Sequence, residues 1–139
     1  MTIIDIFVMP IRNGETSSFK REAFEEIMGR GAINPRPPFC NIEYADGGCE
    51  VFGADDEDIS SLMIDHFGGE TFFDRLWELA ERTGSFFAWT GAGGGYAVTD
   101  SALLAHLPPG IADDPEPPLV VDDGRALEAA IFGYADDQK

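Results

Sequence analysis

The sequence predicts an α+β fold, with about three to four helices packed largely on one face of a mainly antiparallel sheet of about five to seven strands. Strand-like segments come in neighbouring pairs, and helical segments separate these pairs. The chain has 139 residues, of which 44% are hydrophobic, so it is long enough to bury a core. We therefore expect a single domain over residues 1–139.

The pattern of apolar residues, glycines and prolines predicts the secondary structure of residues 3–38. The run Ile3–Met9 is rich in β-branched and aromatic residues and is stopped by Pro10, which predicts a buried strand. Ser18 can cap a helix over residues 19–28 that Gly29 ends. Residues 32–38 contain three prolines and offer few donors to a sheet, so they are expected to form an extended connection.

A hairpin is predicted around Asp46-Gly47, which is a strong two-residue turn signal between Cys40–Ala45 and Gly48–Gly53. In that register Tyr44 faces Cys49, and Cys40 lies about 13 Å along the strand from Cys49. This separation exceeds the reach of a disulfide. We expect two small core thiols, with a redox or metal pair as the alternative.

The clearest predicted element is a helix over Phe72–Thr83, with Thr71 and Asp74 as its capping box. Before it, Ile59–His66 is expected to form either a third strand that returns antiparallel after the acidic turn Asp55–Asp58, or a helix over Ser60–Met63. One arc of the Phe72–Thr83 helix is apolar and the opposite arc is charged, so this helix should dock one face on the sheet. The apolar arc contains Phe72, Phe73, Leu76, Trp77, Leu79 and Ala80.

The C-terminal part is expected to add strands, short helices and an acidic loop. Residues 107–118 hold five prolines and several carboxylates, which predicts an exposed loop, and residues 135–139 are expected to be a tail. The other expected elements are strands over Ser85–Thr90, Tyr96–Thr99 and Leu119–Val121, a helix over 101–106 capped by Asp100, and a final helix capped by Asp123 with Leu127, Ala130, Ile131 and Tyr134 on its apolar stripe and Phe132 off it.

The charge of the chain restricts its partners. The formal net charge is −17, and residues 54–139 carry 18 acids against 4 bases. Such a surface repels nucleic acid and anionic lipid and attracts basic protein surfaces. No apolar segment reaches membrane length, so we expect a cytoplasmic protein that binds neither nucleic acid nor membrane.

Two groups of side chains are candidate catalytic or metal sites. Asp65, His66 and Glu70 form an acid–His cluster, in which His66 is either a general base, a metal ligand or a surface histidine. Asp55, Asp56 and Asp58 are candidates for a hard cation. Because these acids are consecutive and no glycine lies among them, a solvated turn is the simpler interpretation.

No cofactor is expected from the motifs present. The loop Gly91–Gly95 lacks the Lys and Ser/Thr of a phosphate-binding loop, and Tyr96 replaces the third glycine of the dinucleotide pattern. No nucleophile signature such as Gly-x-Ser-x-Gly occurs.

Two aromatic residues fall outside the predicted core. Phe52 lies on the polar face of the hairpin, beside Glu43 and Glu50, and Phe132 lies off its helix stripe. They either pack against a second layer or form an apolar patch rimmed by carboxylates, which suits a basic partner.

These observations favour a non-enzymatic module that docks a basic protein, as an inhibitor, immunity factor or adaptor does. An enzyme or small-molecule binder using Asp65, His66 and Glu70 is the second hypothesis. A structural subunit of an assembly of unknown stoichiometry is the third.

Overall fold

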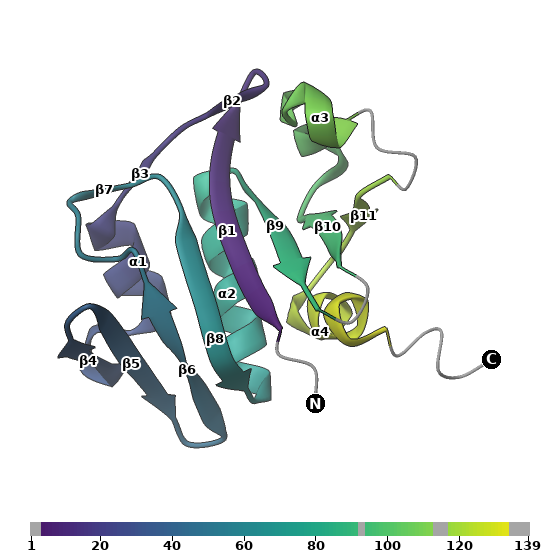
Figure 1. Cartoon of the computed structure of the whole chain (residues 1–139). Coiled ribbons are helices and arrows are strands. Elements are labelled where there is room, and N and C mark those ends of the chain that lie inside the picture. The colour runs from purple at the N-terminus through teal and green to yellow at the C-terminus, as the bar shows by residue number, and fades with distance from the viewer. Residues whose placement is uncertain (1–3, 92–93, 113–116, 134–139) are drawn as a thin grey trace.

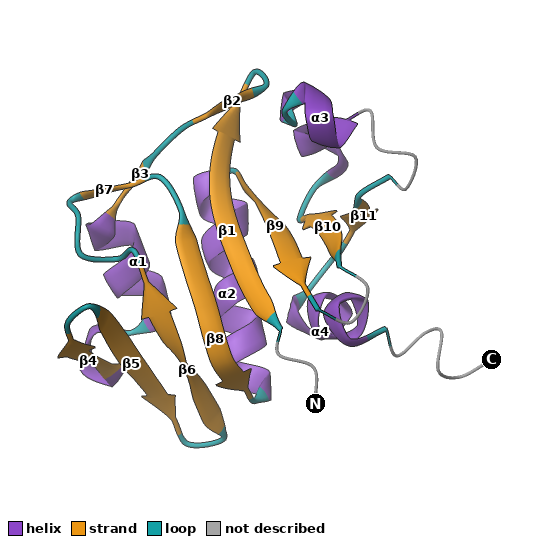
Figure 2. Cartoon of the chain, in the orientation of Figure 1, coloured by secondary structure: helices purple, strands orange, loops and turns teal. Residues whose placement is uncertain are grey.

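A mixed β-sheet runs through the computed structural model, with the strand order β11-β10-β9-β1-β8-β6-β5-β4 (Figures 1 and 2). The structure describes residues 4–91, 94–112 and 117–133. Neighbours on this path pair antiparallel, except that β10 and β11 are parallel. The strands are β1 (Asp5–Arg12), β4 (Ile33–Arg36), β5 (Phe39–Tyr44), β6 (Gly47–Phe52), β8 (Leu62–Gly68), β9 (Ser85–Thr90), β10 (Gly95–Val98) and β11 (Leu119–Val120), and β2 (Glu15–Thr16) pairs with the end of β1.

Three helices cover one face of this sheet: α1 (Arg21–Met28), α2 (Glu70–Thr83) and α4 (Gly124–Phe132) (Figure 1). The shorter helices are η1 (Arg30–Ala32), η2 (Ser101–His106) and α3 (Pro109–Ala112). The expected α+β class is confirmed. The sheet has more strands than expected, and it is mixed because η2 and α3 provide the crossover that a parallel β10–β11 pair requires.

The main core lies between the sheet and these three helices. From α2, the side chains of Phe72, Phe73, Leu76, Leu79 and Ala80 are at most 1% exposed, which confirms the apolar arc. Trp77 is half-buried, and its Nε1 donates a hydrogen bond to the carbonyl oxygen of Val121 at 2.8 Å. The predicted caps of the later helices are also confirmed, because the side chains of Asp100 and Asp123 accept hydrogen bonds from Ala102 N and Ala126 N.

A second, smaller core forms on the opposite face, at the end near η2. It contains Ile11, Phe86, Val98 and Leu107. Leu107 is therefore buried, and residues 109–112 are helical, whereas the whole stretch 107–118 was expected to be an exposed loop. Residues 113–116 of that stretch, and Tyr134 with the expected tail, lie outside the described residues. None of the described helices is both long and apolar enough to cross a membrane.

Several predicted boundaries near the N-terminus are wrong. Strand β1 continues through Pro10 to Arg12. Helix α1 begins at Arg21 without a side-chain cap from Ser18, because Phe19–Lys20 form strand β3, which pairs with β7 (Asp58–Ile59). The proline-rich segment is a paired strand, β4, where Pro35 is tolerated because the strand is at the edge of the sheet.

The β5–β6 hairpin forms, but in a different register. Tyr44 faces Gly47, so Ala45 and Asp46 form the turn in place of Asp46 and Gly47. The shift is two residues, an even number, so every side chain keeps its predicted face. Cys40 and Cys49 are buried and are free thiols, as expected. The predicted separation along the strand is wrong, because Ile42 faces Cys49 and Cys40 is two residues from that position, not four. Burial raises the pKa of both thiols.

Candidate functional site on the uncovered sheet face

The face of the sheet opposite α1, α2 and α4 is uncovered over β1, β8, β6 and β5 (Figure 1). Strand alternation directs Ile6 and Ile64 toward the helices, where they are fully buried. Their neighbours Phe7 and Met63 point the opposite way and remain half-buried. Partly exposed side chains of this kind can contact another molecule.

Apolar side chains form a continuous row on this face, which we call the apolar row. The strand register places Phe39 opposite Phe52, Phe52 opposite Met63, and Met63 opposite Phe7. The row continues through Ala88 and Tyr96 on β9 and β10. All six side chains are half-buried, and the rings of Phe39 and Phe52 lie 5.3 Å apart.

A row of polar residues, which we call the carboxylate row, lies next to the apolar row. Asn41 is opposite Glu50, and Glu50 is opposite Asp65. Because Ile6 pairs with Ile64, the same register brings Asp5 beside Asp65. Carboxylates therefore stand side by side on three neighbouring strands, an arrangement that repulsion between like charges disfavours.

His66 joins this row through a bulge in β8. Gly48 pairs with Gly68 and Glu50 with Asp65, so two residues of β8, His66 and Phe67, face the single residue Cys49 of β6. His66 occupies the left-handed region, with φ 49°, which is unusual for a residue other than glycine. The bulge puts Asp65 and His66 on the same face and turns Phe67 toward the helices.

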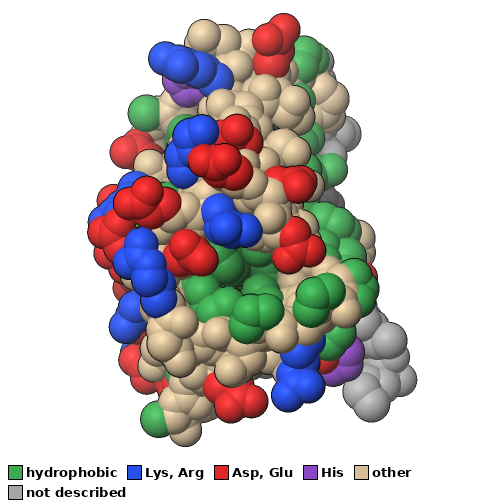
Figure 3. Space-filling model, turned by 90° about the vertical axis from the view of Figure 1, so that its left-hand side faces the viewer, with side chains coloured by type: hydrophobic (Ala, Val, Ile, Leu, Met, Phe, Trp, Pro, Cys, Tyr) green, Lys and Arg blue, Asp and Glu red, His purple; other side chains and the backbone are tan. Residues whose placement is uncertain are grey.

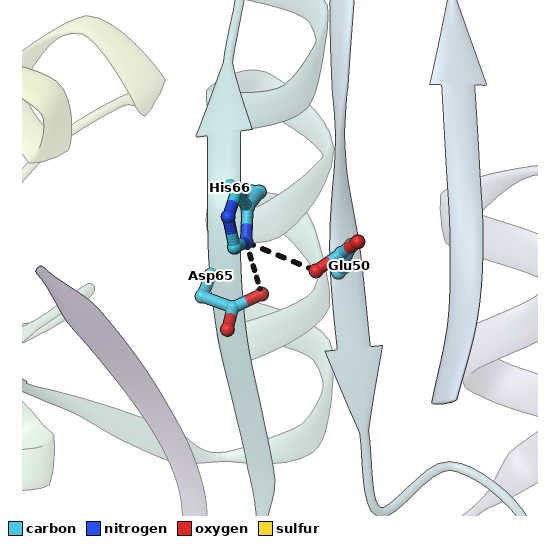
Figure 4. Close-up of side chains that lie close together, drawn as sticks. All are labelled: Glu50, Asp65 and His66. Atoms are coloured by element: carbon cyan, nitrogen blue, oxygen red, sulfur yellow. Dashed lines mark ion pairs between the residues drawn. The ribbon is translucent and has the colours of Figure 1, made fainter. Parts of the chain in front are cut away.

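One nitrogen of the His66 imidazole, Nδ1, faces the carboxylates of both Glu50 and Asp65 (Figure 4). Nδ1 of His66 is 2.9 Å from Oε2 of Glu50 and 3.1 Å from Oδ1 of Asp65. The side chain of His66 is 74% exposed, whereas those of Glu50 and Asp65 are 29% and 17% exposed. The hydrogen bond with Asp65, followed by the negative charge of Glu50, raises the pKa of His66. The protonated ring can therefore hold the two carboxylates together.

Glu70, the third member of the predicted acid–His cluster, lies elsewhere. It opens α2 and lines a pocket of about 320 Å³ together with Phe73, Arg125 and Glu128. The predicted capping box of Thr71 and Asp74 is also wrong, since the residue before α2 is Gly69 and gives no side-chain cap. Asp46 of the hairpin turn accepts the hydrogen bond from Thr71 N instead.

Asp55, Asp56 and Asp58, the predicted cation site, form no group of potential metal ligands among the described residues. Asp58 forms an ion pair with Lys20 at 2.7 Å across the β3–β7 pair. In contrast, Glu50, Asp65 and His66 each offer a ligand atom, and these atoms all lie within 4.8 Å of one another.

The predicted interaction residues are divided between two faces. Glu43, Glu50 and Phe52 share the uncovered face, and Glu43, Glu50 and His66 line a shallow depression of about 300 Å³. Phe132 lies on the helix side, where its ring centroid is 6.0 Å from that of Phe67 and 6.2 Å from that of Phe73.

Sequence reasoning missed most of the apolar row and the contact of Glu50 with His66. Phe7, Phe39, Met63 and Tyr96 are ordinary strand residues, and only the pairing of distant strands places them side by side. Asp5, which interrupts the apolar run of the first strand, was the available sign that one face of this strand is not buried in the main core.

The chain was compared with models of protein families, with curated proteins and with solved structures, and none of the three comparisons gave a match.

Proposed function

We propose that the protein is a non-enzymatic binding module that docks a basic protein through the uncovered face of its sheet. The apolar row next to the carboxylate row supports this proposal more directly than any other feature. Protein interfaces combine a central apolar area with a polar rim. Here Phe39, Phe52, Met63 and Phe7 supply the apolar area, and Glu43, Glu50 and Asp65 supply the rim.

The partner we propose presents lysine or arginine side chains beside an apolar anchor. The anchor would contact Phe52 and Met63, and the cations would reach Glu50 and Asp65. The depression beside His66, lined by Asn41, Glu43 and Glu50, offers space for a cationic side chain. The net charge of −17 adds a long-range attraction, which speeds association at low salt.

Hydrophobic side chains also gather on the adjoining side of the molecule, which Figure 3 shows. They occupy the lower centre of that view, and acidic and basic side chains surround them. This side includes the edge strand β4, whose residue Arg36 faces Phe39 at the end of the apolar row. The docking surface can therefore extend around this edge.

The small-molecule hypothesis receives less support. It depended on a pocket shared by Asp65, His66 and Glu70, and Glu70 lines a different pocket from His66. Neither cysteine is suited to act as a nucleophile, since burial raises the pKa of both thiols.

The test uses the double variant Phe52→Ser/Met63→Ser, with Leu104→Ser as the control. Leu104 is 38% exposed, and it lies on η2, outside both rows. Each protein captures partners from host lysate, and a captured basic protein is then purified and titrated. We expect wild type and Leu104→Ser to bind it with association rates that fall as salt rises, and the double variant to bind weakly. Equal binding by all three folded proteins would refute the proposed surface.

A further inference from the structure

We propose that Glu50, Asp65 and His66 form a binding site for a divalent transition-metal ion such as Zn²⁺. The site shares Glu50 and Asp65 with the proposed docking surface, but the observations that support it do not depend on the docking function. The inference rests on the kind of donor atoms, on their spacing and on the shielding of one of them.

The spacing of the donors suits a metal ion. Zinc binds nitrogen and oxygen ligands at about 2.0–2.2 Å in a tetrahedral arrangement, so neighbouring donors around it lie roughly 3.3–3.6 Å apart. Nδ1 of His66 is 2.9 Å from Glu50 Oε2 and 3.1 Å from Asp65 Oδ1. These two separations are somewhat shorter than that spacing, and all three ligand atoms lie within 4.8 Å of one another, so side-chain rotations that open the cluster would bring the three donors around one ion.

The bulge fixes the imidazole of His66 in this arrangement. In a regular strand, consecutive side chains point to opposite faces, so Asp65 and His66 would be separated by the sheet. The extra residue in β8 places both on the uncovered face, next to Glu50 of β6 (Figure 4). The three ligands come from two adjacent, paired strands, which hold their backbones in place.

The environment of Asp65 also favours a cation. Its Oδ1 atom is shielded from solvent, and within the described residues Nδ1 of His66 is its only nitrogen partner. A shielded carboxylate oxygen needs a cation beside it; the protonated His66 ring supplies one, and a divalent ion that displaces its proton would neutralise the carboxylates more completely. The neighbouring carboxylates Glu50 and Asp5 add negative charge at the same place.

The donor set indicates which metal is suitable. Calcium and magnesium take oxygen ligands, whereas an imidazole nitrogen with two carboxylates suits zinc and related transition metals. On binding, Nδ1 gives up its proton to solvent and directs its lone pair at the ion. Three protein ligands leave at least one position for water on the solvent side, where the His66 side chain is 74% exposed.

The test titrates the tag-free, metal-stripped chain with Zn²⁺ in a calorimeter, for wild type and the variants Glu50→Gln, Asp65→Asn and His66→Gly. Glycine tolerates the backbone conformation of residue 66, so His66→Gly should remain folded. Glu43→Gln is the matched control, because Glu43 lines the same depression but is outside the donor set.

We expect wild type and Glu43→Gln to bind one Zn²⁺ with affinities within about twofold, and each ligand variant to bind at least about tenfold more weakly. The chain has only two histidines, so imidazole NMR signals provide a second measurement. The His66 signals should shift on adding Zn²⁺, and those of His106 should not. Binding that His66→Gly retains, or a shift confined to His106, would overturn the proposal.

Discussion

The carboxylate of Asp46 accepts a hydrogen bond from the backbone nitrogen of Thr71 at 3.0 Å. This bond ties the turn of the β5–β6 hairpin to the first turn of α2, across 25 residues of sequence. It satisfies one of the amide groups that every helix leaves unpaired at its start, and it places a negative charge at the positive end of the helix dipole. The same bond lowers the pKa of Asp46.

The stabilising effect of Asp46 should therefore depend on pH. Since its pKa is lower in the folded state than in the unfolded state, its contribution is complete above the unfolded value of about 3.9 and disappears as the pH falls through the folded value. We expect Asp46→Ala to be less stable than wild type at neutral pH, and the difference to shrink in acid. Urea unfolding measured between neutral and acidic pH tests this.

Asp46→Asn is the control for that experiment. Asparagine keeps a cap acceptor but does not titrate. The difference in unfolding free energy between Asp46→Asn and Asp46→Ala should therefore stay constant with pH. If this difference shrank in acid as much as that between wild type and Asp46→Ala, the pH effect would belong to another group.

Gly69, immediately before α2, should not tolerate a side chain. Its φ is 98°, and a Cβ atom there would lie 2.7 Å from the carbonyl oxygen of Asp46. We expect Gly69→Ala to lower the free energy of unfolding by more than about 1 kcal/mol. Gly31→Ala is the matched control, because a Cβ atom at Gly31 has no neighbour within 4 Å. Equal stability of the two variants would contradict the close approach of the hairpin turn to α2.

The stability of variants at residue 66 should depend on the backbone conformation that the new residue prefers. A β-branched side chain is strongly disfavoured at φ 49°, whereas glycine is not. We expect His66→Val to unfold at lower urea concentration than wild type, and His66→Gly to unfold at a similar or higher concentration. If the order of these two variants were reversed, the left-handed conformation in the β8 bulge would be wrong.

Phe132 should matter for stability and not for docking. Its ring packs on Phe67 and Phe73 on the helix side of the sheet. Phe132→Ala should cost about 0.5–3 kcal/mol of stability, because it removes apolar contacts from a partly buried site. Its affinity for a partner of the uncovered face should equal that of wild type when both are folded. Selective loss of partner binding would place Phe132 in the interface.

Patterns within a single element predicted much of the fold. The apolar arc of α2 depends on helical periodicity alone, and the caps Asp100 and Asp123 act on residues two and three positions away. Such signals involve residues only a few positions apart, so a short window of the sequence contains all of the information.

The errors concern contacts between distant segments. Asp46-Gly47 is a favourable turn by itself, but in the observed hairpin Gly47 lies against the backbone of Gly68, where a Cβ atom would collide with the carbonyl oxygen. The cap of α2 likewise comes from the hairpin. Glu50 reaches His66 only because β6 and β8 are neighbours and β8 has a bulge. No local pattern contains this information.

The bulge also adds one side chain to the uncovered face without changing the core. If His66 were deleted and not replaced, β8 would regain strict alternation, and Phe67, now next to Asp65, would still point toward the helices. Its ring would keep its contacts with Phe72 and Phe73, and Gly68 would keep its partner Gly48. The extra residue therefore serves the surface and not the packing of the strand. Loss of this one codon should give a folded chain that lacks the imidazole, whereas loss of the next codon would leave His66 in the place of Phe67 and remove the ring from these contacts.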